Sequence, residues 1–211
     1  MAKPPNRQVT IDFIFDFGSP NAYLAGKVLP AVAERTGATI NRIPCLLGGI
    51  FKATNNASPM VAFGEVKGKL AYEGLETRRF VAKHGLTAYR PNPHFPVNTL
   101  LIMRGVIAAR RAGVEDAYVA AVLAAMWEAG EKMDDPEVVV RVLTAAGLDG
   151  AALVAATQDP EVKAELVANT EAAVQRGVFG IPTFFVGDEM FFGKDRLDQV
   201  EAEAARQAAV G

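Results

Sequence analysis

The stretch VTIDFIFDFGSP, residues 9–20, decides the fold. Its first nine residues are rich in β-branched and aromatic side chains, which is typical of a buried strand. Ser19-Pro20 is a strong helix-start signal, because the hydroxyl can cap a helix and proline fits its first turn. Apolar residues follow at helical spacing until Gly37, and residues 38–47 predict a second strand. The opening strand–helix–strand implies a parallel pair with a right-handed crossover.

Strands return only near the carboxyl end. Residues 181–186 and 190–192 flank a Gly-Asp turn and predict a β-hairpin, and residues 194–208 predict a final helix. Residues 60–175 show helical patterns separated by Pro and Gly breaks, without a fixed repeat. The order βαβ, helical insertion, ββα predicts an α/β fold. We expect one discontinuous α/β domain, residues 1–55 and 176–211, and an all-helical insertion, residues 56–175.

Composition excludes several classes of protein. The 211 residues are half hydrophobic and carry a net charge of -2, so no basic excess is available for nucleic acid. One cysteine excludes an intrachain disulfide, and two histidines with one cysteine predict no metal cluster. Residues 1–7 lack the apolar stretch of a secretory signal, and no apolar run is long enough to cross a membrane. We therefore expect a cytoplasmic protein.

Five short stretches, in the same order along nearly the whole chain, resemble a known family. The predicted order of elements resembles the thioredoxin fold, and the helical insertion resembles its DsbA-like branch. Within that branch the chain is similar to the 2-hydroxychromene-2-carboxylate isomerases and the kappa-class glutathione transferases. The stretches that carry the resemblance are Phe15–Pro20, Leu46–Lys52, Phe95–Asn98, Gly180–Thr183 and Phe192–Arg196.

The resemblance places Ser19 where related redox enzymes have the attacking cysteine of a Cys-x-x-Cys motif. Here the four residues are Ser-Pro-Asn-Ala, so dithiol exchange is not available. A serine hydroxyl at a helix N-terminus can instead stabilise a foreign thiolate, which the resemblance identifies as that of glutathione. Lowering a thiol pKa from about 8.5 by about two units requires about 2.7 kcal/mol. A helix terminus offers up to about 2 kcal/mol and a hydrogen bond to a charged group about 1.5–3 kcal/mol.

The resemblance also implies the other contacts to glutathione. Pro182 is expected to follow a cis bond, so that the backbone of Ile181 can pair with the cysteinyl part. Lys194 and Asp195 correspond to positions that hold the γ-glutamyl group, although some relatives have a smaller hydroxyl residue in place of the lysine. The remaining expected contacts, to the glycyl end, come from Asn56 (or its neighbour Asn55) and Lys67.

By resemblance, the activity is the glutathione-dependent isomerisation of 2-hydroxychromene-2-carboxylate to trans-o-hydroxybenzylidenepyruvate, a step in the breakdown of naphthalene-like aromatics. The expected partners are glutathione, a small aromatic carboxylate and a second copy of the chain. Two alternatives stay open, a kappa-like transferase and a non-catalytic glutathione-binding protein. A disulfide oxidoreductase is opposed by Ser19 and Ala22. Cys45 is predicted to be a small buried residue, and Trp127 to belong to the core.

Overall fold

A four-stranded mixed sheet is built from the two ends of the chain. The computed structural model describes residues 8–210, so the predictions about residues 1–7 lie outside it. The strand order is β2-β1-β3-β4, with β1 parallel to β2 and antiparallel to β3, and β3 antiparallel to β4. The strands are β1 (Thr10–Phe15), β2 (Thr39–Pro44), β3 (Thr183–Val186) and β4 (Glu189–Phe192).

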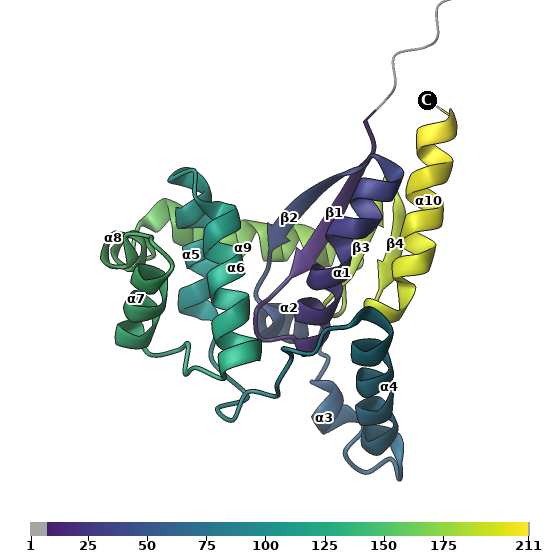
Figure 1. The fold of residues 1–211 in the computed structure, drawn as a ribbon, viewed down its shortest axis with the longest axis horizontal. Helices are drawn as coiled ribbons and strands as arrows, with labels where there is room; N and C mark the ends of the chain where they lie inside the picture. Colours follow the sequence, from purple (N-terminus) through teal and green to yellow (C-terminus); the bar gives the residue numbers. More distant parts are fainter. Residues whose placement is uncertain (1–7, 211) are drawn as a thin grey trace, which may run out of the picture.

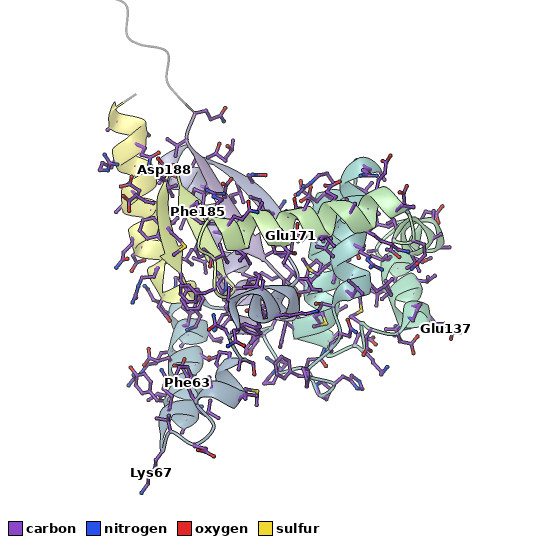
Figure 2. The ribbon with its side chains drawn as sticks, turned by 180° about the vertical axis from the view of Figure 1, so that it is seen from behind. Phe63, Lys67, Glu137, Glu171, Phe185 and Asp188 are labelled. Carbon is purple, nitrogen blue, oxygen red and sulfur yellow. The ribbon has the colours of Figure 1, made fainter. Side chains whose placement is uncertain are left out.

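Helices cover both faces of this sheet. Helix α1 (Pro20–Thr36) packs against α10 (Leu197–Val210) on one face, and α9 (Pro160–Gln175) crosses the other face (Figures 1 and 2). The core of the sheet is aromatic, because the ring of Phe13 stacks on those of Phe15 and Phe184 at 5.5 and 5.2 Å. The α/β thioredoxin-like order βαβ…ββα, with helices between its halves, is therefore confirmed.

The helices between the two halves form two groups in Figure 1. One group lies beside the sheet, and the other projects below its edge. The first group contains α5 (Leu100–Arg111), α6 (Glu115–Ala124), a π-helical turn (Ala125–Ala129), α7 (Pro136–Ala145) and α8 (Gly150–Ala156). The second group, which we call the arm, contains α3 (Pro59–Ala62) and α4 (Lys69–His84), after the short α2 (Leu47–Thr54).

Local signals set the ends of α1. The Ser19 side chain accepts a hydrogen bond from the Ala22 N–H as N-cap, Pro20 occupies the first turn, and Gly37 closes the helix with φ 68°.

Two predicted segments are shorter than expected. The second strand ends at Pro44 because α2 begins at Leu47, and the last helix opens with a 3-10 turn over Lys194–Arg196.

Candidate functional site

One edge of the sheet brings together four segments that are far apart in the sequence. Strands β1 and β2 are parallel, so Phe15 and Pro44 end side by side. Strand β3 runs the other way, and Thr183 at its start pairs with Phe192 at the end of β4. The residues that follow β1, β2 and β4, and those that precede β3, therefore meet at this edge. Ligands commonly bind where strand ends meet helix N-termini in such sheets.

Ser19 is at the centre of this edge. The residue is only 4% exposed, and its Oγ accepts from the Ala22 N–H and donates to the Ile181 carbonyl, both at 3.2 Å. The first turn of the 17-residue helix α1 contains no acidic side chain that would compete with a bound anion. A hydroxyl donor at this N-terminus can therefore stabilise a negative charge placed against it.

The loop before β3 has the predicted backbone conformation. The Ile181–Pro182 bond is cis, and the Pro182 carbonyl accepts a hydrogen bond from the Gly193 N–H at 2.9 Å. The Ile181 carbonyl faces the Ser19 hydroxyl. These bonds hold Ser19, the cis-proline loop and the segment after β4 next to one another. A second cis bond, Phe95–Pro96, was not predicted from the sequence.

Lys194 and Asp195 form a charged pair at the end of β4. The Lys194 side chain is 2% exposed, whereas that of Asp195 is 56% exposed. The Lys194 Nζ donates to both Asp195 carboxylate oxygens, at 3.0 and 3.1 Å, and lies 5.4 Å from the centre of the Phe80 ring. A buried lysine needs such compensation. Of the two charged groups only the Asp195 carboxylate reaches the surface, where it can accept a hydrogen bond from an ammonium group.

Asn56 and Lys67 are both exposed but lie in different parts of the fold. Asn55 has φ 53° and caps α2, so it has a structural role, whereas Asn56 is exposed just after it. Lys67 lies at the free end of the arm in Figure 2, pointing away from the sheet. Phe80, in the last part of α4, is the arm residue that lies beside Lys194. From Lys69 to Phe80 the helix is about 16 Å long. Lys67 is thus separated from the Ser19 edge within a single chain.

Sequence reasoning missed Asp16, which is the buried acid of this edge. It is 1% exposed, and its carboxylate accepts from the N–H groups of Gly18 at 2.9 Å and Leu47 at 2.8 Å. Burial raises the pKa of Asp16, while the Leu47 and Gly18 N–H groups and the Thr99 side chain act in the lowering direction. Only its place directly after a strand could have marked it, since two of these partners are far away in the sequence.

Aromatic side chains extend from Ser19 toward the helical insertion. Tyr23, one turn into α1, stacks on Tyr89 at 5.7 Å, and Tyr89 stacks on Trp127 at 6.2 Å. Trp127 in turn lies 6.1 Å from Phe95, which is 41% exposed. Burial, followed by a hydrogen bond to Glu128, raises the pKa of the Tyr23 phenol, so this group stays neutral. Tyr23 and Trp127 are buried and support the other two rings, so Phe95 and the half-buried Tyr89 are the ones that an aromatic ligand can contact.

The buried residues named from the sequence have structural roles. Trp127 is 2% exposed, as predicted, and its Nε1 donates to the Phe17 carbonyl at 2.8 Å. Cys45 is fully buried, as predicted, and its Sγ donates to the Asn169 carbonyl. Burial, with a smaller contribution from the charge of Asp16, raises the pKa of this thiol to about 12, so it is not a nucleophile.

Within residues 8–210, no three His, Cys, Asp or Glu side chains are grouped as metal ligands would be. No helix among the same residues is long and apolar enough to cross a membrane.

Comparison with known proteins gives concordant results. Residues 10–205 match the DsbA-like thioredoxin domain. The chain is 34% identical to a 2-hydroxychromene-2-carboxylate isomerase of Sphingobium xenophagum, covering 92% of this chain and 96% of that protein. It is 31% identical to the protein of the same name from Pseudomonas putida, covering 93% and 94%. The human glutathione S-transferase kappa 1 is 24% identical, covering 90% and 88%. A solved 2-hydroxychromene-2-carboxylate isomerase superposes with a TM-score of 0.80 at 30% identity, covering 93% of this chain and 95% of that one.

Proposed function

The chain belongs to the DsbA-like thioredoxin domain family and, within it, to the 2-hydroxychromene-2-carboxylate isomerases, and on that basis we propose that it is a glutathione-dependent isomerase. Its substrate is a small aromatic carboxylate, 2-hydroxychromene-2-carboxylate, and its product is trans-o-hydroxybenzylidenepyruvate. The observation that carries the proposal is the Ser19 hydroxyl. It lies at the N-terminus of α1, next to the cis-proline loop, at the sheet edge that also holds Lys194 and Asp195.

The residues at this edge fit glutathione. The exposed Asp195 carboxylate is available to the α-ammonium of the γ-glutamyl group, whereas the buried Lys194 ammonium would have to turn from Asp195 to reach the α-carboxylate. The backbone of Ile181 lies against Ser19, where an extended cysteinyl residue can pair with it. Asn56 is exposed after α2 and is proposed to bind the glycyl end. We assign Lys67 to the same end, with its approach depending on the position of the arm.

When bound at this edge, glutathione would supply a thiolate nucleophile for reversible addition to the enone that forms when the ring C–O bond of the hemiketal substrate opens. Ser19 has the main role on the protein side. Its hydroxyl rotates from the Ile181 carbonyl toward the sulfur, and it stabilises the negative charge before addition and after departure. The N-terminus of α1 stabilises the same charge. Tyr89 and Phe95, which pack on the buried rings of Tyr23 and Trp127, hold the aromatic part of the substrate against this site.

We place the contact of the proposed cytoplasmic homodimer on the arm. Six large apolar side chains are between 39% and 73% exposed there, and contiguous apolar patches of this kind mark interaction surfaces. A subunit contact would also fix the arm, and with it Lys67. The six residues are Met60, Val61, Phe63, Val66, Leu70 and Tyr72. Light scattering of the wild type and of Val61→Asp tests this placement, since the variant is expected to be a monomer and a dimeric variant would contradict it.

Limiting glutathione separates the proposed activity from the alternatives. The protein is mixed with the chromene substrate and about one tenth of an equivalent of glutathione, and both product and free thiol are measured. The isomerase converts all the substrate to its equilibrium mixture and leaves the thiol titre unchanged. A kappa-like transferase stops after the glutathione is consumed as a stable conjugate. A non-catalytic glutathione-binding protein binds glutathione but gives no conversion. The last two outcomes overturn the proposal.

A further inference from the structure

Asp16 is a buried carboxyl group to which the mechanism above gives no role. It follows β1 directly, and the residue is 1% exposed. Carboxylates are rarely buried to this extent unless their oxygens are satisfied. Here Oδ1 accepts from the Gly18 N–H at 2.9 Å and Oδ2 from the Leu47 N–H at 2.8 Å. Both oxygens therefore accept backbone donors, which is the geometry expected of an ionised carboxylate.

Three helix N-termini converge on this carboxylate. Gly18 precedes the N-cap of α1, Leu47 is the first residue of α2, and Thr99 is the N-cap of α5. The Thr99 side chain lies next to Asp16 and acts to lower its pKa, and it leaves Gly18 so little space that a Cβ there would lie 3.1 Å from the Thr99 methyl group. The first turns of all three helices lack acidic side chains. Asp16 supplies the negative charge that these positive helix ends would otherwise lack.

The same residue fixes the turn that carries Ser19. Its carboxylate binds the Gly18 N–H, and its backbone carbonyl accepts the Ser19 N–H at 3.1 Å. Two consecutive N–H groups before α1 are thus bound to one residue. The Ser19 Oγ has to lie between the Ala22 N–H and the Ile181 carbonyl, and a shift of about 1 Å in such a group can cost about 100-fold in rate.

We propose that Asp16 is a positioning residue for Ser19, which fixes the hydroxyl at the thiol site by joining the N-termini of α1, α2 and α5. The inference rests on the proposed function of Ser19. It also connects that site to two other parts of the molecule. Helix α2 leads to Asn56, and α5 belongs to the helical group beside the aromatic surface. One buried side chain would therefore fix the positions of the thiol site, one end of the proposed glutathione site and the helical insertion relative to one another.

A purely electrostatic role of Asp16 predicts the opposite result from a positioning role. An ionised carboxylate near Ser19 repels a thiolate, so removing its charge would lower the pKa of the bound thiol. If Asp16 instead positions the Ser19 hydroxyl, its removal weakens the hydrogen bond to the thiolate, and the pKa of the bound thiol rises. The sign of this change separates the two roles, and a role in folding stability alone changes neither the bound thiol nor the turnover of the folded fraction.

The test compares Asp16→Asn, Thr99→Val and Tyr118→Phe with the wild type. The asparagine turns one acceptor into an N–H donor that faces an N–H group, while the valine removes only the Thr99 hydroxyl. Tyr118→Phe is the matched control. It removes another buried hydrogen bond, from the Tyr118 hydroxyl to the Ile102 carbonyl at 2.9 Å, and leaves the Gly18 and Leu47 N–H groups that bind Asp16 in place. Three properties are measured: amide hydrogen exchange at Gly18, Ser19 and Leu47, ultraviolet thiolate absorbance of bound glutathione against pH, and kcat and KM.

For Asp16→Asn we expect amide exchange at these three residues to rise about 10-fold or more and the pKa of the bound thiol to rise by about one unit. We expect kcat to fall about 10-fold or more at saturating glutathione. Thr99→Val changes all three properties in the same direction by less, and it carries the test if Asp16→Asn does not fold. Tyr118→Phe loses stability without these changes.

Two results overturn the inference, and a third overturns the proposed function. A bound-thiol pKa that falls in Asp16→Asn would show that charge matters rather than position. If Asp16→Asn and Thr99→Val both turn over substrate as fast as Tyr118→Phe, Asp16 has a role in stability only. If the wild type itself does not ionise glutathione, the proposed function fails. The exchange data would then still decide whether Asp16 holds the turn, and unchanged exchange would refute that as well.

Discussion

Replacing Ser19 by alanine removes one oxygen atom that makes two contacts. The Oγ accepts from the Ala22 N–H at 3.2 Å as the cap of α1, and it donates to the Ile181 carbonyl at 3.2 Å. The first contact stabilises the fold, and the donor of the second is the one assigned to the glutathione thiolate. Ser19→Ala should therefore change both stability and rate, through separate interactions.

The structure allows the two effects to be estimated separately. Loss of an N-cap costs about 1 kcal/mol of folding stability, which a chain of 211 residues with a buried core can tolerate. Loss of a hydrogen bond to a charged group costs about 1.5–3 kcal/mol, or about 10- to 150-fold in kcat. The N-terminus of α1 remains in the variant, so some thiol activation survives. The pKa of the bound thiol should rise by about one to two units.

The assay measures initial isomerisation rates at saturating glutathione, together with the melting temperature. Asp149→Ala is the matched control, because Asp149 caps α8 in the same way, accepting from the N–H three residues later, Ala152, at 3.0 Å. Both variants should melt a few degrees below the wild type. Only Ser19→Ala should lose turnover. Wild-type turnover in folded Ser19→Ala, or an equal loss in Asp149→Ala, would refute the assignment of Ser19.

Three further predictions concern other parts of the molecule. Lys194→Met should raise the KM for glutathione about 10-fold with little change in kcat, because it removes a charge-assisted contact to the α-carboxylate. Gly105→Ala should lower stability by about 1–3 kcal/mol, measured by urea unfolding, because the added Cβ would lie 1.9 Å from the Tyr118 hydroxyl. A hydrogen bond from Lys27 lowers the pKa of Glu128, so Glu128 stabilises the fold above its unfolded pKa of about 4.3. The stability difference between wild type and Glu128→Gln should therefore be present at pH 7 and disappear as the pH falls through the lowered value in the folded protein.

Each of these predictions has an outcome that contradicts it. For Lys194, the probe is 4-aminobutyryl-cysteinylglycine, which lacks the α-carboxylate; wild type and variant should bind it equally, and a remaining difference would refute the assignment. For Gly105, an unchanged unfolding midpoint would show that Tyr118 moves without cost. For Glu128, a stability difference that grows on acidification would have the wrong sign for a carboxyl with a lowered pKa.

The sequence predicts those elements whose signals are local. The start of α1 follows from Ser19-Pro20 and its end from Gly37, and the Gly187-Asp188 turn predicts the hairpin. The end of β2 was predicted too late. Residues after Pro44 are apolar like a strand, but the N–H of Leu47 binds the Asp16 carboxylate and α2 begins there. A contact to another strand end, rather than composition, decides that boundary.

The candidate site was predictable only where a residue's role is visible in its own segment. The cis-proline loop at Ile181-Pro182 has a short signature, and its conformation is confirmed. The burial of Lys194 depends on Phe80 from the arm, which the sequence does not place beside it. Asp16 depends on Leu47 and Thr99, from two different helices, so its own stretch indicated only that it directly follows a strand.

The most direct test of the proposed function is the rate of isomerisation with and without glutathione. Purified protein is added to 2-hydroxychromene-2-carboxylate, and the absorbance of trans-o-hydroxybenzylidenepyruvate is followed. We predict a fast approach to equilibrium only when glutathione is present, with the thiol titre the same at the end as at the start. An equal rate without glutathione, or no acceleration with glutathione bound, would contradict the assignment of a glutathione-dependent isomerase.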